Sequence, residues 1–90
     1  MKTEEVIYKL KLLNNNWKLT DNKLHIKIEF KTFKDCFNFM NTIAIESEKL
    51  NHHPLWTNEY NKLDIKLFTH DKGKITDLDF KLAKVIDELL

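Results

Sequence analysis

The stretch from residue 23 to residue 30 reads KLHIKIEF, and its alternation of polar and apolar side chains decides the class of fold. Its apolar members are Leu24, Ile26, Ile28 and Phe30. Successive side chains of a β-strand point to opposite faces of a sheet, so this pattern predicts a strand with one buried and one solvent-exposed face. His25 lies on the solvent-exposed face, where we expect it to be solvated.

A second stretch, residues 62–69, reads KLDIKLFT and repeats the same alternation. Its buried face is predicted to carry Leu63, Ile65, Leu67 and Thr69. Shorter strands are expected at residues 17–19, before a turn at 20–22, and at residues 56–60. Because these strands come in pairs along the chain, they favour hairpins and an antiparallel sheet.

Helical periodicity replaces the alternation in three segments, which cover residues 4–13, 32–50 and 76–89. Thr3 is a candidate N-cap for the first helix. Thr32 and Thr76 are candidates for the other two, because each is followed three residues later by an aspartate, as in a capping box. Asn14, Asn15 and Asn16 are expected to end the first helix, since asparagine tolerates turn geometry.

The long middle helix has an apolar stripe that we expect to form core. Its members are Phe33, Phe37, Met40, Ala44 and Ser47, widened by Cys36, Phe39, Ile43 and Leu50. Ninety residues without a linker make one domain, residues 1–90. The order of elements predicts an α+β fold in which three helices cover one face of an antiparallel sheet. The exposed sheet edges of so small a domain favour pairing with another copy.

Composition excludes several classes of function. The net charge is only +1 and every basic residue is lysine, so the chain lacks both a strong field for nucleic acid and the arginines that read guanine. No apolar run is long enough to span a membrane. Cys36 is the only cysteine, which fits a reducing compartment. Residues 1–5 lack an apolar signal core, and we therefore expect a cytoplasmic protein.

Three of the four histidines flank one predicted strand: His52 and His53 come before Pro54, and His70 follows Thr69. Imidazole titrates near neutral pH and exchanges protons without strong tuning. A metal site is one alternative, but adjacent side chains diverge in extended backbone, so His52 and His53 do not readily bind one ion. Structural capping and acid–base catalysis both remain open from the residue types alone.

A wider set of residues surrounds these histidines in a specific order. It comprises Glu48-Lys49-Leu50-Asn51-His52-His53-Pro54, Trp56, Asn58, Tyr60-Asn61-Lys62, Thr69-His70, Thr76 and Asp79, with Trp17 before them. This pattern resembles the pterin-4a-carbinolamine dehydratase family over nearly the whole chain. The chain departs from the family pattern at Asn16, at Asn51 and around Lys74, and none of these positions is a histidine.

The resemblance implies a four-stranded antiparallel sheet with three α-helices on one face, in a homodimer or homotetramer. It implies the dehydration of 4a-hydroxytetrahydropterin to quinonoid dihydropterin during tetrahydrobiopterin recycling, with no metal or other cofactor. His52 and His70 would transfer protons, and His53 would orient the pterin or share the acid role. The residues implied in substrate binding are Glu48, Pro54, Trp56, Thr69, Asp71 and Lys72.

An alternative from another class comes with the same resemblance. Animal members of the family also serve as dimerisation cofactors of a transcription activator, through a helix surface that excludes the histidines. On that alternative the chain is a non-catalytic interaction module, and substitution of the histidines leaves its function intact.

Overall fold

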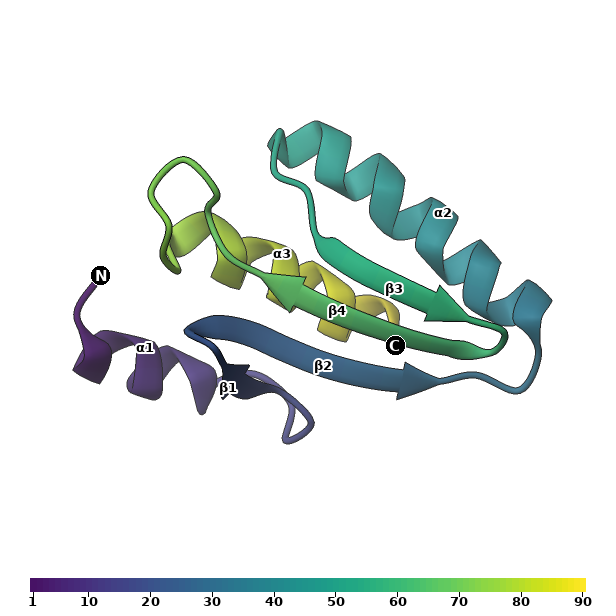
Figure 1. Ribbon diagram of the computed structural model, residues 1–90, viewed down its shortest axis with the longest axis horizontal. Helices are drawn as coiled ribbons and strands as arrows, with labels where there is room; N and C mark the ends of the chain where they lie inside the picture. Colours follow the sequence, from purple (N-terminus) through teal and green to yellow (C-terminus); the bar gives the residue numbers. More distant parts are fainter.

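The computed structural model describes residues 1–90 and contains all seven predicted elements (Figure 1). In chain order they are α1 (Thr3–Leu10), β1 (Lys18–Thr20), β2 (Lys23–Glu29), α2 (Phe33–Leu50), β3 (Leu55–Glu59), β4 (Lys62–Leu67) and α3 (Asp77–Leu89). The α+β class is therefore confirmed. None of the helices combines the length and the hydrophobicity that a membrane-spanning segment requires.

The four strands form one sheet in the order β1-β2-β4-β3, and every neighbouring pair is antiparallel. Two tight hairpins build it. The β1–β2 turn has positive φ at both Asp21 and Asn22, which is the type I′ geometry that suits the twist of a hairpin. Leu24 of β2 pairs with Leu67 of β4, so the two predicted alternating stretches lie side by side at the centre of the sheet.

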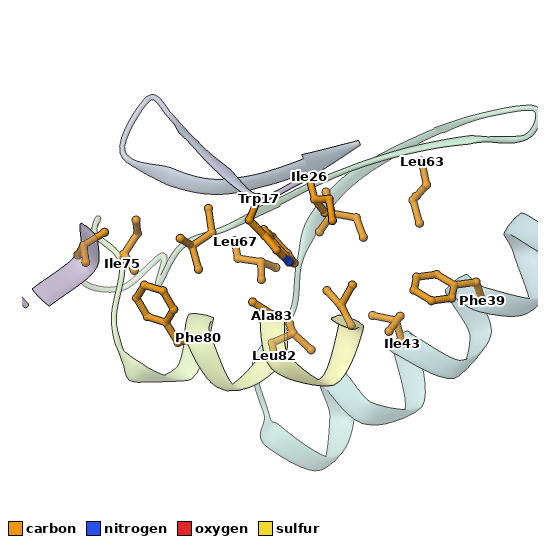
Figure 2. Close-up of a cluster of buried hydrophobic side chains, with 14 of the residues drawn as sticks. Trp17, Ile26, Phe39, Ile43, Leu63, Leu67, Ile75, Phe80, Leu82 and Ala83 are labelled. Atoms are coloured by element: carbon orange, nitrogen blue, oxygen red, sulfur yellow. The ribbon is translucent and has the colours of Figure 1, made fainter. Parts of the chain in front are cut away.

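The core fills the space between one face of the sheet and the helices. Figure 2 shows Ile26 and Leu63 pointing from the sheet toward Leu82 of α3 and Ile43 of α2. These side chains are at most 1% exposed. Burial of one such side chain stabilises the fold by about 1.5–3 kcal/mol, so the polar-apolar alternation in β2 and β4 determines which face the helices cover.

The helix caps agree with the sequence at two of three positions. Thr32 accepts a hydrogen bond from the Asp35 amide at 3.1 Å, and the Thr76 amide donates to the Asp79 carboxylate at 2.8 Å. The prediction for Thr3 is wrong by one residue, because the extended cap is Lys2 and Thr3 is already helical. Helix α1 also ends at Leu10, before the three asparagines.

The prediction of a wholly buried aromatic stripe on α2 is wrong. The buried side chains are Cys36, Phe39, Ile43 and Ser47, whereas Phe33 and Phe37 are 45% and 46% exposed. Two neighbouring stripes of α2 are apolar, and a helix lying on a sheet covers only one of them. Phe33 and Phe37 instead pack on each other, with ring centroids 5.6 Å apart.

The prediction of a solvated His25 is also wrong, since its side chain is almost fully buried although it lies on the face away from the helices. Its Nδ1 lies 2.8 Å from the Thr20 hydroxyl, and its Nε2 lies 2.9 Å from Asp64 Oδ1. Thr20 is in β1 and Asp64 is in β4. His25 therefore joins three strands through polar contacts that the alternation pattern does not reveal.

Candidate active site

The histidines gather at one end of the sheet because of the β3–β4 hairpin. Leu55, at the start of β3, pairs with Lys66, near the end of β4. The segment before Leu55 and the segment after Lys66 therefore leave the sheet side by side. Figure 1 shows the C-terminal end of α2 and the turn after β4 at this same end. His52 and His53 lie in the first segment, and His70 lies in the second.

A Schellman motif at the end of α2 positions His52. The His52 amide donates to the Ser47 carbonyl at 3.0 Å, and the Asn51 amide donates to the Glu48 carbonyl at 3.2 Å. Asn51 adopts the left-handed conformation that this motif requires, with φ 50° and ψ 44°. Asparagine tolerates that conformation better than most residues, which is a local reason for an asparagine at this position.

His52 is 6% exposed and forms the most buried polar contact of the site. Its Nε2 lies 2.5 Å from Oδ1 of Asp79, whose side chain is fully buried. Because an ionised carboxylate only accepts hydrogen bonds, Nε2 carries the proton and donates it. The contact fixes the orientation and tautomer of the ring and leaves Nδ1 as the nitrogen available for chemistry.

Asp79 is itself held by two donors on its other oxygen. The Thr69 hydroxyl donates to Oδ2 at 3.0 Å, and the Thr76 amide donates to the same atom at 2.8 Å. The hydroxyls of Thr69 and Thr76 also lie 2.6 Å apart. Asp79 therefore links the loop after α2, the segment after β4 and the first turn of α3 in one connected polar network.

His53 forms a separate and more exposed pair. Its Nε2 lies 2.5 Å from Oε2 of Glu48, and the two side chains are 55% and 77% exposed. Pro54 follows this pair and is half-buried. The carboxylate orients the imidazole, while the exposure leaves the other ring nitrogen accessible to a ligand. Water screens a pair this exposed, so its contribution to stability is small.

His70 lies in the tight turn that connects β4 to α3. The turn is closed by a backbone bridge between Thr69 and Lys74, and Gly73 within it has φ +63°. The His70 side chain is exposed and hydrogen bonds to no protein side chain; its ring instead packs on Phe68, with centroids 4.1 Å apart. Asp71 and Lys72 are exposed in the same turn.

The structure thus connects some of the predicted site residues and leaves others apart. His52 and Thr69 share the Asp79 network, whereas His53 with Glu48 and His70 with Phe68 are separate contacts at the same end of the sheet. Trp56 is half-buried and packs against the core. No group of three or more histidine, cysteine, aspartate or glutamate side chains is arranged to hold a metal ion.

The largest cavity of the molecule lies elsewhere. Its volume is about 480 Å³, and it lies between α1 and α3. Its lining residues are Lys9, Leu12, Leu13, Phe80, Lys84, Asp87 and Glu88. None of the histidines lines this cavity.

Asp79 is the member of the site that sequence reasoning did not assign as a functional residue. The pattern of Thr76 followed by Asp79 predicts a capping box, and the structure contains one. The same carboxylate also contacts His52, which is 27 residues earlier in the chain. A local pattern cannot reveal a contact that depends on where α3 packs.

The fold and the site together define a class: a small α+β domain whose sheet carries, at one end, paired imidazole and carboxylate groups suited to proton transfer. The sequence profile described as Pterin 4 alpha carbinolamine dehydratase matches residues 1–89. The chain belongs to this family.

Individual relatives agree with this assignment. The chain is 51% identical over 73 residues to a provisionally named pterin-4-alpha-carbinolamine dehydratase of Prochlorococcus marinus, covering 81% of this chain and 76% of the relative. It is 40% identical over 87 residues to a protein of the same provisional name from Christiangramia forsetii, covering 97% and 89%.

Solved structures also resemble the chain. The crystal structure of a transcriptional coactivator/pterin dehydratase from Brucella melitensis matches with a TM-score of 0.94 and 34% identity, covering 99% of this chain and 96% of that one. A pterin dehydratase-like protein identified as a RuBisCO assembly factor in the alpha-carboxysome matches with a TM-score of 0.66 at 18% identity, covering 81% and 84%. That second likeness concerns the fold alone.

Proposed function

We propose that the protein is a hydro-lyase that dehydrates 4a-hydroxytetrahydropterin to quinonoid dihydropterin by histidine acid–base catalysis. The observation that carries the proposal is the buried pair of His52 and Asp79, beside the segment that bears His70. Membership of the dehydratase family supports the same reaction. A pterin fits the proposal better than a nucleic acid, because the chain has a net charge of only +1 and no arginine.

The dehydration requires two proton transfers. The bond between C4a and its hydroxyl oxygen breaks as the ring nitrogen bonded to C4a supplies an electron pair and forms a double bond to that carbon. A proton must reach the leaving oxygen, which departs as water, and a proton must leave the ring. One proton is delivered and one is removed, so the catalyst returns to its starting state and needs no cofactor.

His52 is suited to one of these transfers. Asp79 holds Nε2–H, so Nδ1 exchanges the proton and the carboxylate faces the ring while it carries charge. His70 is suited to the other, because no protein group occupies its nitrogens. His53 would orient the pterin or share the acid role, with Glu48 holding its ring. Positioned acid–base groups of this kind typically contribute about 10²–10⁴-fold in rate.

The remaining predicted contacts complete the proposed substrate site. Pro54 and Trp56 would contact the pterin on the β3 side. Thr69, Asp71 and Lys72 would contact it on the side of the turn between β4 and α3. We also propose that the enzyme acts in the cytoplasm, in tetrahydrobiopterin recycling, and as a homodimer or homotetramer. Light scattering after size-exclusion chromatography measures the number of copies directly.

The three histidines can be tested by single substitutions to alanine. We expect His70→Ala to retain the fold, since its side chain is exposed, and to lose most of the acceleration of dehydration. His52→Ala should lose it as well, and His53→Ala should lose less. Circular dichroism checks that each variant is folded. Turnover like that of the wild type in folded His70→Ala protein would refute the assignment of His70.

A protein-interaction module is the second candidate function. The observation that favours it is the pair of half-exposed aromatic side chains, Phe33 and Phe37, on the outer surface of α2. The Brucella relative is described as a transcriptional coactivator as well as a dehydratase. This candidate predicts that the histidine variants behave like the wild type and that Phe37→Lys abolishes association with a protein partner.

A further inference from the structure

Phe68 directly follows β4 and precedes the segment that carries His70. The proposed chemistry does not yet give it a role. Its neighbour Thr69 points into the Asp79 network. Because side chains alternate along extended backbone, Phe68 and His70 lie together on the other side of the chain. Their ring centroids are 4.1 Å apart, with an angle of 47° between the ring planes. The two rings are therefore in direct contact.

The contact matters because His70 has no other orienting partner. His52 is held by Asp79 and His53 by Glu48, each through a carboxylate. The imidazole of His70 lacks a carboxylate partner, and its side chain is exposed in a turn. An exposed side chain on a turn samples several rotamers unless something packs against it. Packing on Phe68 orients the ring while both nitrogens stay free.

The Phe68 ring is itself held in place from β2. Lys23 Nζ lies 4.8 Å from the ring centroid, within the range of a cation–π contact. The register explains this placement, because Leu24 pairs with Leu67 at the end of the ladder and Lys23 and Phe68 each lie one residue beyond that pair. Both side chains are half-buried. A cation, a phenyl ring and an imidazole thus pack in series from the sheet to the turn.

We propose that Phe68 is a positioning residue that orients the His70 imidazole for proton transfer, and that Lys23 holds Phe68 in place. This inference rests on the proposed dehydratase function and extends it to two residues outside the histidine and carboxylate set. An aromatic pair contact corresponds to about a 2- to 10-fold change in an equilibrium. Loss of the Phe68 ring should therefore lower kcat by roughly that factor and leave KM nearly unchanged.

Two substitutions at position 68 distinguish the effect of the aromatic ring from the effect of apolar side-chain volume. Phe68→Leu removes the aromatic face and keeps an apolar side chain, whereas Phe68→Tyr keeps the ring. Phe37→Leu, at a half-exposed phenylalanine on α2, is the matched control for loss of a phenyl ring elsewhere. We expect a lower kcat in the leucine variant at position 68, and values like those of the wild type in the other two proteins.

A proton NMR measurement tests the stacking without relying on activity. The ring current of Phe68 should displace the imidazole C–H resonances of His70, which are identified by their loss in His70→Gln. Phe68→Leu should return them to the free-histidine position, and Phe68→Tyr should not. Lys23→Met, which removes the cation and retains the stem, should give an intermediate displacement.

The outcomes separate this inference from the proposed function. Resonances of His70 that are identical in the wild type and in Phe68→Leu would overturn the inference, whatever the activity. A lost displacement with unchanged kcat would overturn it too, since the stack would then serve only the fold. A wild type that shows the displacement of the His70 resonances but does not accelerate dehydration would refute the proposed function, and the kinetic measurement alone would show this.

Discussion

Replacement of Asp79 by asparagine changes one atom of the most buried contact in the site. In the native protein Oδ1 faces His52 Nε2 at 2.5 Å, and Oδ2 accepts hydrogen bonds from Thr69 and Thr76. If the amide keeps its oxygen toward the two threonine donors, its NH₂ group faces Nε2–H. Two donors cannot bond each other, so His52 must transfer its proton to Nδ1 and accept at Nε2.

The altered tautomer prevents His52 from exchanging a proton at Nδ1. A neutral ring that carries its proton on Nδ1 cannot accept another there, and it cannot donate that proton without becoming an imidazolate. Asp79→Asn should therefore lower turnover by up to the full contribution of one acid–base group, about 10²–10⁴-fold. This factor corresponds to about 2.7–5.5 kcal/mol in the activation free energy.

Stability should fall at the same time. Loss of hydrogen bonds to a buried charged group costs about 1.5–3 kcal/mol. In a domain of 60–100 residues each 1 kcal/mol lowers Tm by roughly 4–8 °C, so we expect Asp79→Asn to melt roughly 6–24 °C below the wild type. The variant should still be folded at a low assay temperature, where its turnover can be compared with that of the wild type.

A matched control exists two residues earlier in the same helix turn. Asp77 has a 68% exposed side chain and contacts neither His52 nor Thr69. Asp77→Asn is the same chemical change without the site contact, so it should leave turnover unchanged. Folded Asp79→Asn protein with turnover within about threefold of the wild type would refute the reasoning on the His52 tautomer.

Three further predictions concern the rest of the fold. His25→Ala should lower the free energy of unfolding by about 1–3 kcal/mol in urea titrations, because Asp64 loses its buried partner, and should leave dehydration unchanged; an unaltered midpoint would contradict this. Burial raises the pKa of the Cys36 thiol, so it should react with a disulfide reagent far more slowly in the native than in the unfolded protein, and equal rates would contradict its burial. The hydrogen bond from Lys9 lowers the pKa of Asp77 below 3.8, so its stabilising effect is present above that pH and is lost as the pH falls through the lowered value. Urea titrations of the wild type and Asp77→Asn should therefore differ near neutral pH and converge in strong acid, and a constant difference would contradict the ion pair.

Local patterns predict those parts of the fold that depend on local physics. The alternation in residues 23–30 and 62–69 identifies the two central strands, because a sheet buried on one face imposes a period of two. The N-cap at Thr32 and the capping box at Thr76 identify where two helices begin, because the first amides of a helix need acceptors. The family resemblance supplies the number of strands, which the structure confirms.

Contacts between distant segments explain what the sequence does not predict. His25 lies on the polar face of the alternating pattern, where a solvent-exposed side chain is expected, yet Thr20 of β1 and Asp64 of β4 cover it. Phe37 has the spacing of a core residue, yet its neighbouring stripe on α2 packs against the sheet. Asp79 has the position of a helix cap, yet it meets His52. In each case the deciding neighbour is set by tertiary packing.

Dehydration of freshly generated 4a-hydroxytetrahydropterin, followed by absorbance against the uncatalysed rate, tests the central claim most directly. The wild type is compared with a His52→Ala/His70→Ala double variant whose fold is checked by circular dichroism. We expect the wild type to accelerate the reaction and the double variant to lose that acceleration. A folded wild type that leaves the rate unchanged, or a double variant that retains the acceleration, would contradict histidine-catalysed dehydration by this protein.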